Sequence, residues 1–167
     1  MLPLVLNPVN LRAGLAGRGA ERDRRAALLA DAGVEARLLP DSVSDEILAP
    51  LQVLFVAGLP EGEARELALR ARALGVLVNV EDVLPLCDFH VPAVVRRGDL
   101  LLTVSTGGQV PGLARALRES LAEQFGPEWT DRLKNLGMAR AKWRSEGFSP
   151  REVSQHVRDM ISRMGWL

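Results

Sequence analysis

Apolar runs and stretches with helical spacing alternate through the first half of the chain. Strands are predicted at residues 11–16, 35–39, 51–57 and 76–80. The third of these, LQVLFVA, is a continuous apolar run, which is typical of a strand buried on both faces. A helix is predicted at 21–32, with Leu28 and Leu29 on its inner face, and another at 61–74, where Leu67, Ala71 and Leu74 have helical spacing. A glycine follows each stretch. This alternation predicts an α/β fold with a Rossmann-like parallel sheet.

The pattern changes after residue 91. Residues 92–97 and 100–105 are apolar segments joined by Gly98-Asp99, a connection suited to an antiparallel hairpin. Because an isolated hairpin is only marginally stable, we expect it either to join the main sheet or to pair with a second copy of the chain. From Gly112 onward the spacing is helical, and Ser149-Pro150-Arg151-Glu152 is a helix start signal.

Composition narrows the class of protein. The 167 residues carry 21 Lys+Arg and 21 Asp+Glu, and this balance argues against bulk electrostatic binding of nucleic acid or an anionic membrane. A single cysteine, Cys87, can form neither an internal disulfide nor a thiolate metal site. Because the sequence has neither a signal-peptide pattern nor an apolar run of about 18 residues, we expect a soluble, cytoplasmic protein.

The first candidate site is the Gly17-x-Gly19 turn between a predicted strand and a predicted helix. A dinucleotide diphosphate would meet free backbone N–H groups and the positive end of the helix there. An ordinary glycine-rich turn explains the pattern equally well, because Arg22 stands where the third glycine of G-x-G-x-x-G is expected. Asp41, after the second strand, is either a ribose ligand or a solvated turn residue.

Two further segments carry candidate chemistry. Asn79-Val80-Glu81-Asp82 ends the fourth strand, so both carboxylates fall at the edge where open α/β sheets bind ligands. A carboxylate there is either a proton acceptor or an ordinary turn residue. Ser105-Thr106-Gly107-Gly108 precedes a helix and is either a cradle for a phosphate or carboxylate or a simple helix cap.

Several of these segments together resemble a known family. The matching residues are LVNVED at 77–82, LCDF at 86–89, PAVVRRGDL at 92–100 and STGGQVPGLAR at 105–115. They resemble the dehydrogenase module of siroheme synthases, the precorrin-2 dehydrogenases. The resemblance implies oxidation of precorrin-2 to sirohydrochlorin, with NAD as hydride acceptor, in siroheme or cobalamin synthesis.

The resemblance also implies a division of the chain. Residues 1–91 would form the NAD-binding domain, residues 92–125 a hairpin-and-helix dimerisation segment, and residues 126–167 a helical C-terminal domain. The expected assembly is a homodimer, and no resident metal is implied.

The resemblance assigns roles to individual residues. Asp82, which closes the Asn-Val-x-Asp motif, would be the catalytic residue. The residues implied in cofactor binding are Gly17, Arg18, Gly19, Ala20, Glu21, Asp41, Ser42, Ala57, Gly58, Asn79 and Val80. Those implied in substrate binding are Ser105, Thr106, Gly107, Gly108 and Arg115.

The glycine turn departs from the family pattern. Arg18 stands among its glycines, and Glu21-Arg22 replaces an apolar pair. A second hypothesis is therefore a family member that binds a tetrapyrrole or a partner without dehydrogenase activity. A third is that the chain also inserts iron or cobalt into sirohydrochlorin.

Overall fold

The computed structural model describes residues 2–167, and the chain divides into two compact units, Met1–Val91 and Pro92–Leu167. The first unit is an α/β unit that holds one parallel sheet. The second holds an antiparallel hairpin and three helices.

The first unit follows the β-α-β order that the sequence predicts. Its strands and α-helices are β1 (Ala13–Gly17), α1 (Gly19–Asp31), β2 (Arg37–Leu38), α2 (Asp45–Leu48), β3 (Val53–Ala57), α3 (Glu61–Ala73) and β4 (Leu77–Val80). Two short 3₁₀ turns, η1 (Pro8–Asn10) and η2 (Leu84–Leu86), complete it. All strand pairs are parallel, in the order β2-β1-β3-β4, which confirms the predicted Rossmann-like sheet.

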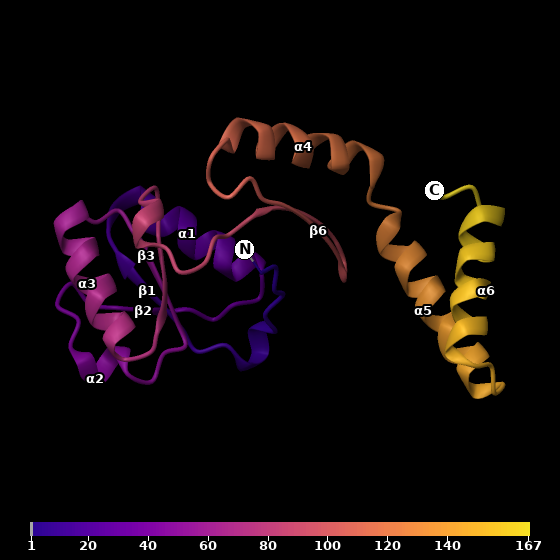
Figure 1. Cartoon of the computed structure of the whole chain (residues 1–167), viewed down its shortest axis with the longest axis horizontal. Helices are drawn as coiled ribbons and strands as arrows, with labels where there is room; N and C mark the ends of the chain where they lie inside the picture. The colour runs from indigo at the N-terminus through magenta and orange to yellow at the C-terminus, as the bar shows by residue number, and fades with distance from the viewer. Residues whose placement is uncertain (1) are drawn as a thin grey trace. The chain divides into compact units, whose positions relative to one another are not determined.

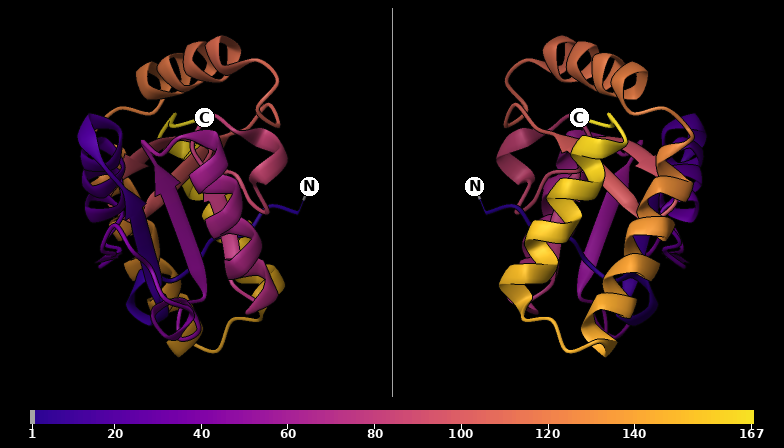
Figure 2. Two further views of the ribbon diagram at one scale, coloured as in Figure 1. Left: turned by 90° about the vertical axis from the view of Figure 1, so that its left-hand side faces the viewer. Right: turned by 90° about the vertical axis from the view of Figure 1, so that its right-hand side faces the viewer.

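The central strands β1 and β3 are buried, and α1 lies on one side of the sheet and α3 on the other (Figures 1 and 2). Alternate residues of the strands supply the two cores. Leu54 and Val56 join the cluster that contains α3, whereas Val53 and Phe55 join the cluster that contains Leu29 of α1. This explains why 51–57 reads as a continuous apolar run, since neither face of β3 meets water.

Strand order determines where a ligand can bind. From β1 the chain crosses to β2 on one side, and β3 then returns to the other side of β1. The order therefore reverses between β1 and β3. In open α/β sheets the crevice outside the carboxyl ends of the strands at such a point is the usual ligand site.

The second unit begins with the hairpin of β5 (Ala93–Arg97) and β6 (Leu100–Val104), paired antiparallel about Gly98, which has φ 58°. The helices α4 (Pro111–Gln124), α5 (Trp129–Ser145) and α6 (Pro150–Arg163) follow. The predicted start of α6 is confirmed as a capping box between Ser149 and Glu152.

The hairpin does not join the main sheet, so that alternative is wrong: β5 and β6 form a separate two-stranded sheet. The outer edge of β4 is already occupied by the segment that follows it. The Asp88 backbone N–H donates to the Val78 carbonyl at 2.7 Å, and the Val78 N–H donates to the Asp88 carboxylate at 2.9 Å. Pairing of the hairpin with a second copy stays a prediction.

Aromatic side chains tie the C-terminus to the start of α5. The ring of Trp129 lies 5.1 Å from that of Phe125 and 6.3 Å from that of Trp166. The guanidinium of Arg132 lies over both tryptophan rings, at 5.1 and 5.2 Å from their centroids. Across residues 2–167, no helix is both long and apolar enough to span a membrane.

Replacement of Leu54 tests the two-sided burial of the sheet. Leu54 is fully buried in β3, so Leu54→Ala should lower the free energy of unfolding by about 3–5 kcal/mol. Urea unfolding followed by far-ultraviolet circular dichroism measures this loss. Tryptophan fluorescence would not report on the sheet, because all three tryptophans lie in the second unit. The control is Leu77→Ala in β4, where the side chain is 52% exposed. Equal losses in the two variants would contradict the described core.

Candidate functional site

The turn between β1 and α1 is held against the end of β3 by backbone contacts. Gly17 has φ 136°, and a Cβ atom on it would overlap the carbonyl of Ala57. Gly58 has φ 71°, and a Cβ there would overlap the carbonyl of Arg18. The Arg18 N–H donates to the Ala57 carbonyl at 3.3 Å. Only glycine fits at positions 17 and 58, where two backbones approach closely.

The N-terminus of α1 lies directly after this turn. Arg18, the residue before α1, makes no side-chain hydrogen bond to the first turn of the helix. Gly19 and Ala20 open the helix, and the first N–H groups of a helix have no partner within it. Such a helix end attracts anions because its N–H groups and the helix dipole both favour negative charge.

One carboxylate of the chain already lies at this helix end. Glu21 is in the first turn, and one of its oxygens would lie 3.4 Å from a Cβ on Gly19. A hydrogen bond from its own backbone, with help from Arg24, holds the pKa of Glu21 below its ordinary value. Its neighbour Arg22 pairs instead with Asp23 at 2.8 Å. Glu21 is therefore ionised at neutral pH and adds negative charge beside the N–H groups.

The side chain of Arg18 reaches across to α3. Its Nη2 lies 2.7 and 2.8 Å from the two carboxylate oxygens of Glu63, in the first turn of that helix. Both side chains are about half exposed, at 48% and 53%. This ion pair joins the element after β1 to the element after β3, on either side of the point where strand order reverses.

The end of β2 contributes to the same sheet edge. Leu38 is in register with Leu15 of β1, and the Leu39 N–H donates to the Leu15 carbonyl at 2.9 Å. Asp41 and Ser42 follow and are exposed. The parallel pairing thus brings the predicted ribose ligands to the edge that carries Gly17.

The turn after β4 carries Asp82 at the same edge. Asp82 is exposed and has φ 61°, the one positive φ of a non-glycine residue among residues 2–167. Aspartate tolerates this left-handed conformation better than most residues, but it still costs on the order of 1 kcal/mol. A conformation of this kind persists only where neighbouring contacts impose it.

Cys87 supplies contacts that hold Asp82 in this left-handed conformation. Its Sγ accepts from the Val80 N–H at 3.3 Å and donates to the Val80 carbonyl at 3.1 Å, so the turn that contains Asp82 closes around the thiol. The side chain of Cys87 also packs against the core beneath α3. The buried amide of Asn79 donates to the Phe89 carbonyl at 2.9 Å and fixes the same segment.

Glu81 forms the least exposed ion pair of this edge. Its Oε1 lies 3.3 Å from Arg25 of α1, and the side chains are only 24% and 11% exposed. The other oxygen, Oε2, is buried without a hydrogen-bond partner. The Arg25 guanidinium also lies 6.0 Å from the centroid of the Phe55 ring. Sequence reasoning placed Glu81 at this edge but missed its partner, since 56 residues separate the two.

The predicted substrate-binding residues lie in the second unit. The Ser105 hydroxyl accepts from the Gly107 N–H and the Thr106 hydroxyl accepts from the Val110 N–H, both at 3.3 Å. Gly107 and Gly108 have φ 65° and 78°. Both hydroxyls therefore accept from backbone N–H groups of the turn before α4, and the helix itself begins after Val110 without a side-chain cap.

Arg115 lies on the exposed surface of α4. It pairs with Glu119 at 2.9 Å, and that hydrogen bond raises the pKa of Arg115. The pair is an ordinary i,i+4 contact along one helix.

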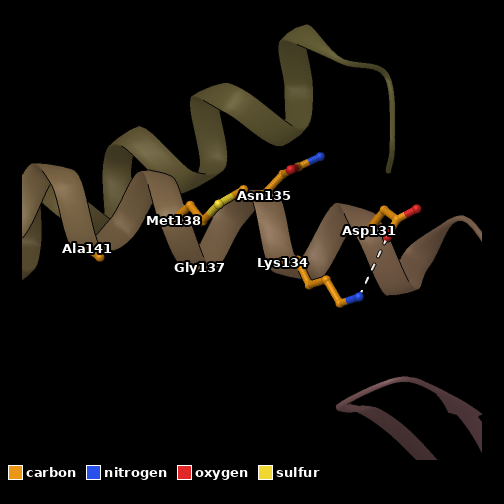
Figure 3. A pocket seen from close by; sticks show the side chains of 6 residues that line it. All are labelled: Asp131, Lys134, Asn135, Gly137, Met138 and Ala141. Carbon is orange, nitrogen blue, oxygen red and sulfur yellow. Dashed lines mark ion pairs between the residues drawn. The ribbon is translucent and has the colours of Figure 1, made fainter.

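The structure contains a hollow elsewhere, on α5 (Figure 3). Its lining residues are Asp131, Lys134, Asn135, Gly137, Met138 and Ala141. None of them is a predicted site residue, and their one ion pair joins Lys134 to Asp131 at 3.9 Å. Residues 2–167 also hold no group of three or more His, Cys, Asp or Glu side chains that could bind a metal ion.

Parallel strands, a glycine turn at the reversal of strand order and an uncapped helix end define a domain of the dinucleotide-binding, Rossmann-like class. Residues 24–93 match a family model described as "Putative NAD(P)-binding". This matched range begins after the glycine turn at residues 17–19, so the match to the family model does not depend on that turn.

Relatives of known name extend this assignment. The chain is 30% identical over 176 residues to a siroheme synthase of Stutzerimonas stutzeri, covering 85% of this chain and 38% of that protein. It is also 30% identical to a siroheme synthase of Tolumonas auensis, covering 97% of this chain and 36% of the relative. The chain belongs to the family formed by the N-terminal module of siroheme synthases. It spans little more than a third of the length of these two relatives.

A solved structure shares the fold. The match to "SirC, precorrin-2 dehydrogenase" has a TM-score of 0.70 and covers 96% of this chain and 89% of that one. The sequences are 19% identical, so this likeness concerns the fold.

Substitution of Gly58 tests the backbone contact beneath the site. Gly58→Ala must separate the turn from β3, and we expect a loss of at least about 2 kcal/mol in the free energy of unfolding. Gly62→Ala is the matched control, because nothing lies within 4 Å of a Cβ at that helical position. The control should keep or raise stability, since alanine favours a helix. Thermal melts of both variants measure the difference, and a Gly58→Ala melt at the wild-type temperature would contradict the contact.

Proposed function

We propose that the chain is an NAD-dependent dehydrogenase that oxidises precorrin-2 to sirohydrochlorin, in siroheme or cobalamin synthesis. The observation that carries the proposal is the meeting, at one sheet edge, of the glycine turn and the Asp82 turn. The names of the relatives and of the structural neighbour support the same chemistry.

The residues present fit a dinucleotide in their backbone. Gly17 and Gly58 let the turn after β1 lie in close contact with the end of β3. The N-terminus of α1 offers backbone N–H groups that the Arg18 side chain does not cap. These groups would hold the diphosphate, Asp41 and Ser42 would face a ribose, and Ala57, Gly58 and Val80 would line the groove. When bound, NAD supplies the hydride acceptor.

Asp82 is the residue that we assign to proton transfer. Its carboxylate is exposed at the sheet edge, where it can reach a substrate C–H or N–H proton as hydride leaves. The left-handed turn points to a residue held for function, because an ordinary turn could use glycine there without strain.

The assembly and location form part of the same proposal. We assign residues 1–91 to cofactor binding, residues 92–125 to dimerisation and residues 126–167 to a helical domain, in a cytoplasmic homodimer. The two-stranded sheet of the hairpin supports dimerisation, since a hairpin gains stability by pairing further. Leu113 and Leu117 of α4 are 49% and 44% exposed and supply an apolar stripe beside it. The substrate carboxylates would then meet Arg115 and the 105–108 turn.

The retained alternative is a family member without dehydrogenase activity. The charges at the glycine turn favour it, because the Glu21 carboxylate lies where a diphosphate would bind. Calorimetric titration with NAD⁺ separates the two hypotheses. Binding at micromolar concentrations supports the dehydrogenase, and failure to bind at millimolar concentrations supports the alternative.

The assignment of Asp82 predicts a selective loss of turnover. Asp82→Asn should lower the rate of sirohydrochlorin formation at least about 100-fold, because it removes the proton acceptor and keeps the turn. Asp82→Gly should be equally inactive yet no less stable, since glycine adopts φ 61° freely.

The measurement is absorbance of sirohydrochlorin in an anaerobic assay with precorrin-2 and NAD⁺. Asp31→Asn, an exposed carboxylate at the end of α1, is the control and should keep its rate. Near-normal turnover of Asp82→Asn would exclude the catalytic assignment.

The dimer proposal predicts that charge on α4 separates the subunits. Leu113→Glu combined with Leu117→Glu should convert a dimer to a monomer, because the carboxylates would have to be buried at the interface. Light scattering coupled to size-exclusion chromatography measures the mass. Leu69→Glu, at a 58% exposed position of α3, should leave the dimer intact. A monomeric wild-type protein at every concentration measured would overturn the proposal.

A further inference from the structure

The ion pair between Arg18 and Glu63 lies at the sheet edge to which we assign the cofactor. Arg18 precedes α1 and Glu63 is in the first turn of α3, so their side chains meet outside the carboxyl ends of β1 and β3. A dinucleotide in this crevice would place its diphosphate beside the same N-terminus of α1. The ion pair and the diphosphate thus compete for one place.

We propose that Arg18 is an exchange residue: it binds Glu63 in the free protein and the cofactor diphosphate in the complex. This inference rests on the proposed function and names a residue pair that determines cofactor affinity. A guanidinium offers paired donors that suit a carboxylate and a phosphate equally well. The diphosphate carries more negative charge than Glu63, so the exchange is favourable for Arg18.

The geometry permits the exchange without movement of the main chain. The Arg18 backbone is fixed by its N–H bond to the Ala57 carbonyl and by the close approach of Gly58. Its side chain, by contrast, is 48% exposed and has only to turn about its own bonds. Exposed ion pairs are weak, so little is lost when Glu63 is released to water.

Glu21 is the second carboxylate, after Glu63, near the N-terminus of α1. It belongs to the first turn of α1, and its lowered pKa keeps it charged at neutral pH. Its partner Arg24 lies 3.4 Å away, a longer contact than the 2.7 Å of the Arg18–Glu63 pair. Glu21 therefore repels an incoming diphosphate, whereas Glu63 competes for the cation that would bind it.

The test is calorimetric titration of the full chain with NAD⁺, ADP and adenosine. Glu63→Gln should tighten binding of NAD⁺ and ADP by about 2- to 5-fold, because an exposed ion pair of ordinary strength no longer competes. Adenosine, which lacks phosphate, should bind equally to both proteins. Arg18→Gln should weaken NAD⁺ and ADP, and in Arg18→Gln/Glu63→Gln the gain from Glu63→Gln should vanish.

Glu61→Gln is the matched control. Glu61 lies in the same first turn of α3, is similarly exposed, and pairs at the same 2.7 Å, but with Arg65 of its own helix. It changes the net charge by the same amount, so a general electrostatic effect would appear in both variants. Thermal melts verify folding, and Arg18→Lys, which keeps the charge without the fork, replaces Arg18→Gln if the latter fails to fold.

The outcomes separate this inference from the proposed function. If no variant binds NAD⁺ at millimolar concentration, the dehydrogenase proposal fails. If wild type binds NAD⁺ but Glu63→Gln binds it no more tightly than Glu61→Gln does, the exchange alone is refuted. A gain that survives in Arg18→Gln/Glu63→Gln also refutes it, because the effect would not pass through Arg18.

Discussion

The contact between the backbones at the ends of β1 and β3 is the constraint on which the rest of the first unit depends. The Gly17 and Gly58 positions let the two chains approach so closely that a Cβ at either would overlap a carbonyl. This approach holds the turn after β1 against the end of β3, and α1 therefore begins directly at the sheet edge. A looser contact would move the N-terminus of α1 away from the edge that carries Asp82, and with it the diphosphate site that we propose.

A second set of backbone contacts organises the end of β4 and also limits where the hairpin can pair. Asp88 and Cys87 fold back on β4 and occupy its hydrogen-bonding groups. The same contacts fix the left-handed Asp82 turn and remove the edge that the hairpin could have used. The following strands must therefore find stability elsewhere, on α4 and, in our proposal, on a second copy of the chain.

Local patterns were sufficient to predict most elements and the family. The run at 51–57, the leucine spacing of α3, the Gly98-Asp99 turn and the capping box are each determined by neighbouring residues. The elements that escaped are too short to show a period, such as the four residues of α2 and the three of η2.

The site was predictable only in part, for a related reason. Parallel strands bring their carboxyl ends together, so the positions of Gly17, Asp41 and Asp82 at one edge follow from the order of elements alone. Side-chain partners depend on tertiary packing: 45 residues separate Arg18 from Glu63, and no local spacing reveals that they meet. The acidic residue in the first turn of α3 was the one available signal, and by itself it is typical of many helices.

The ion pair of Arg18 and the conformation of Asp82 are held in different ways at the same sheet edge. An arginine at position 18 adds a cation to a helix end that already attracts anions, and without ligand that cation needs a partner. Glu63 supplies the partner at half-exposed positions, where separation is easy. Asp82 needs no exchange, because its orientation is imposed by the main chain through the Cys87 turn. In our proposals, the side of the edge that binds the cofactor is therefore adjustable and the side that carries Asp82 is fixed, an arrangement suited to a protein that releases its cofactor while it holds its reacting group in place.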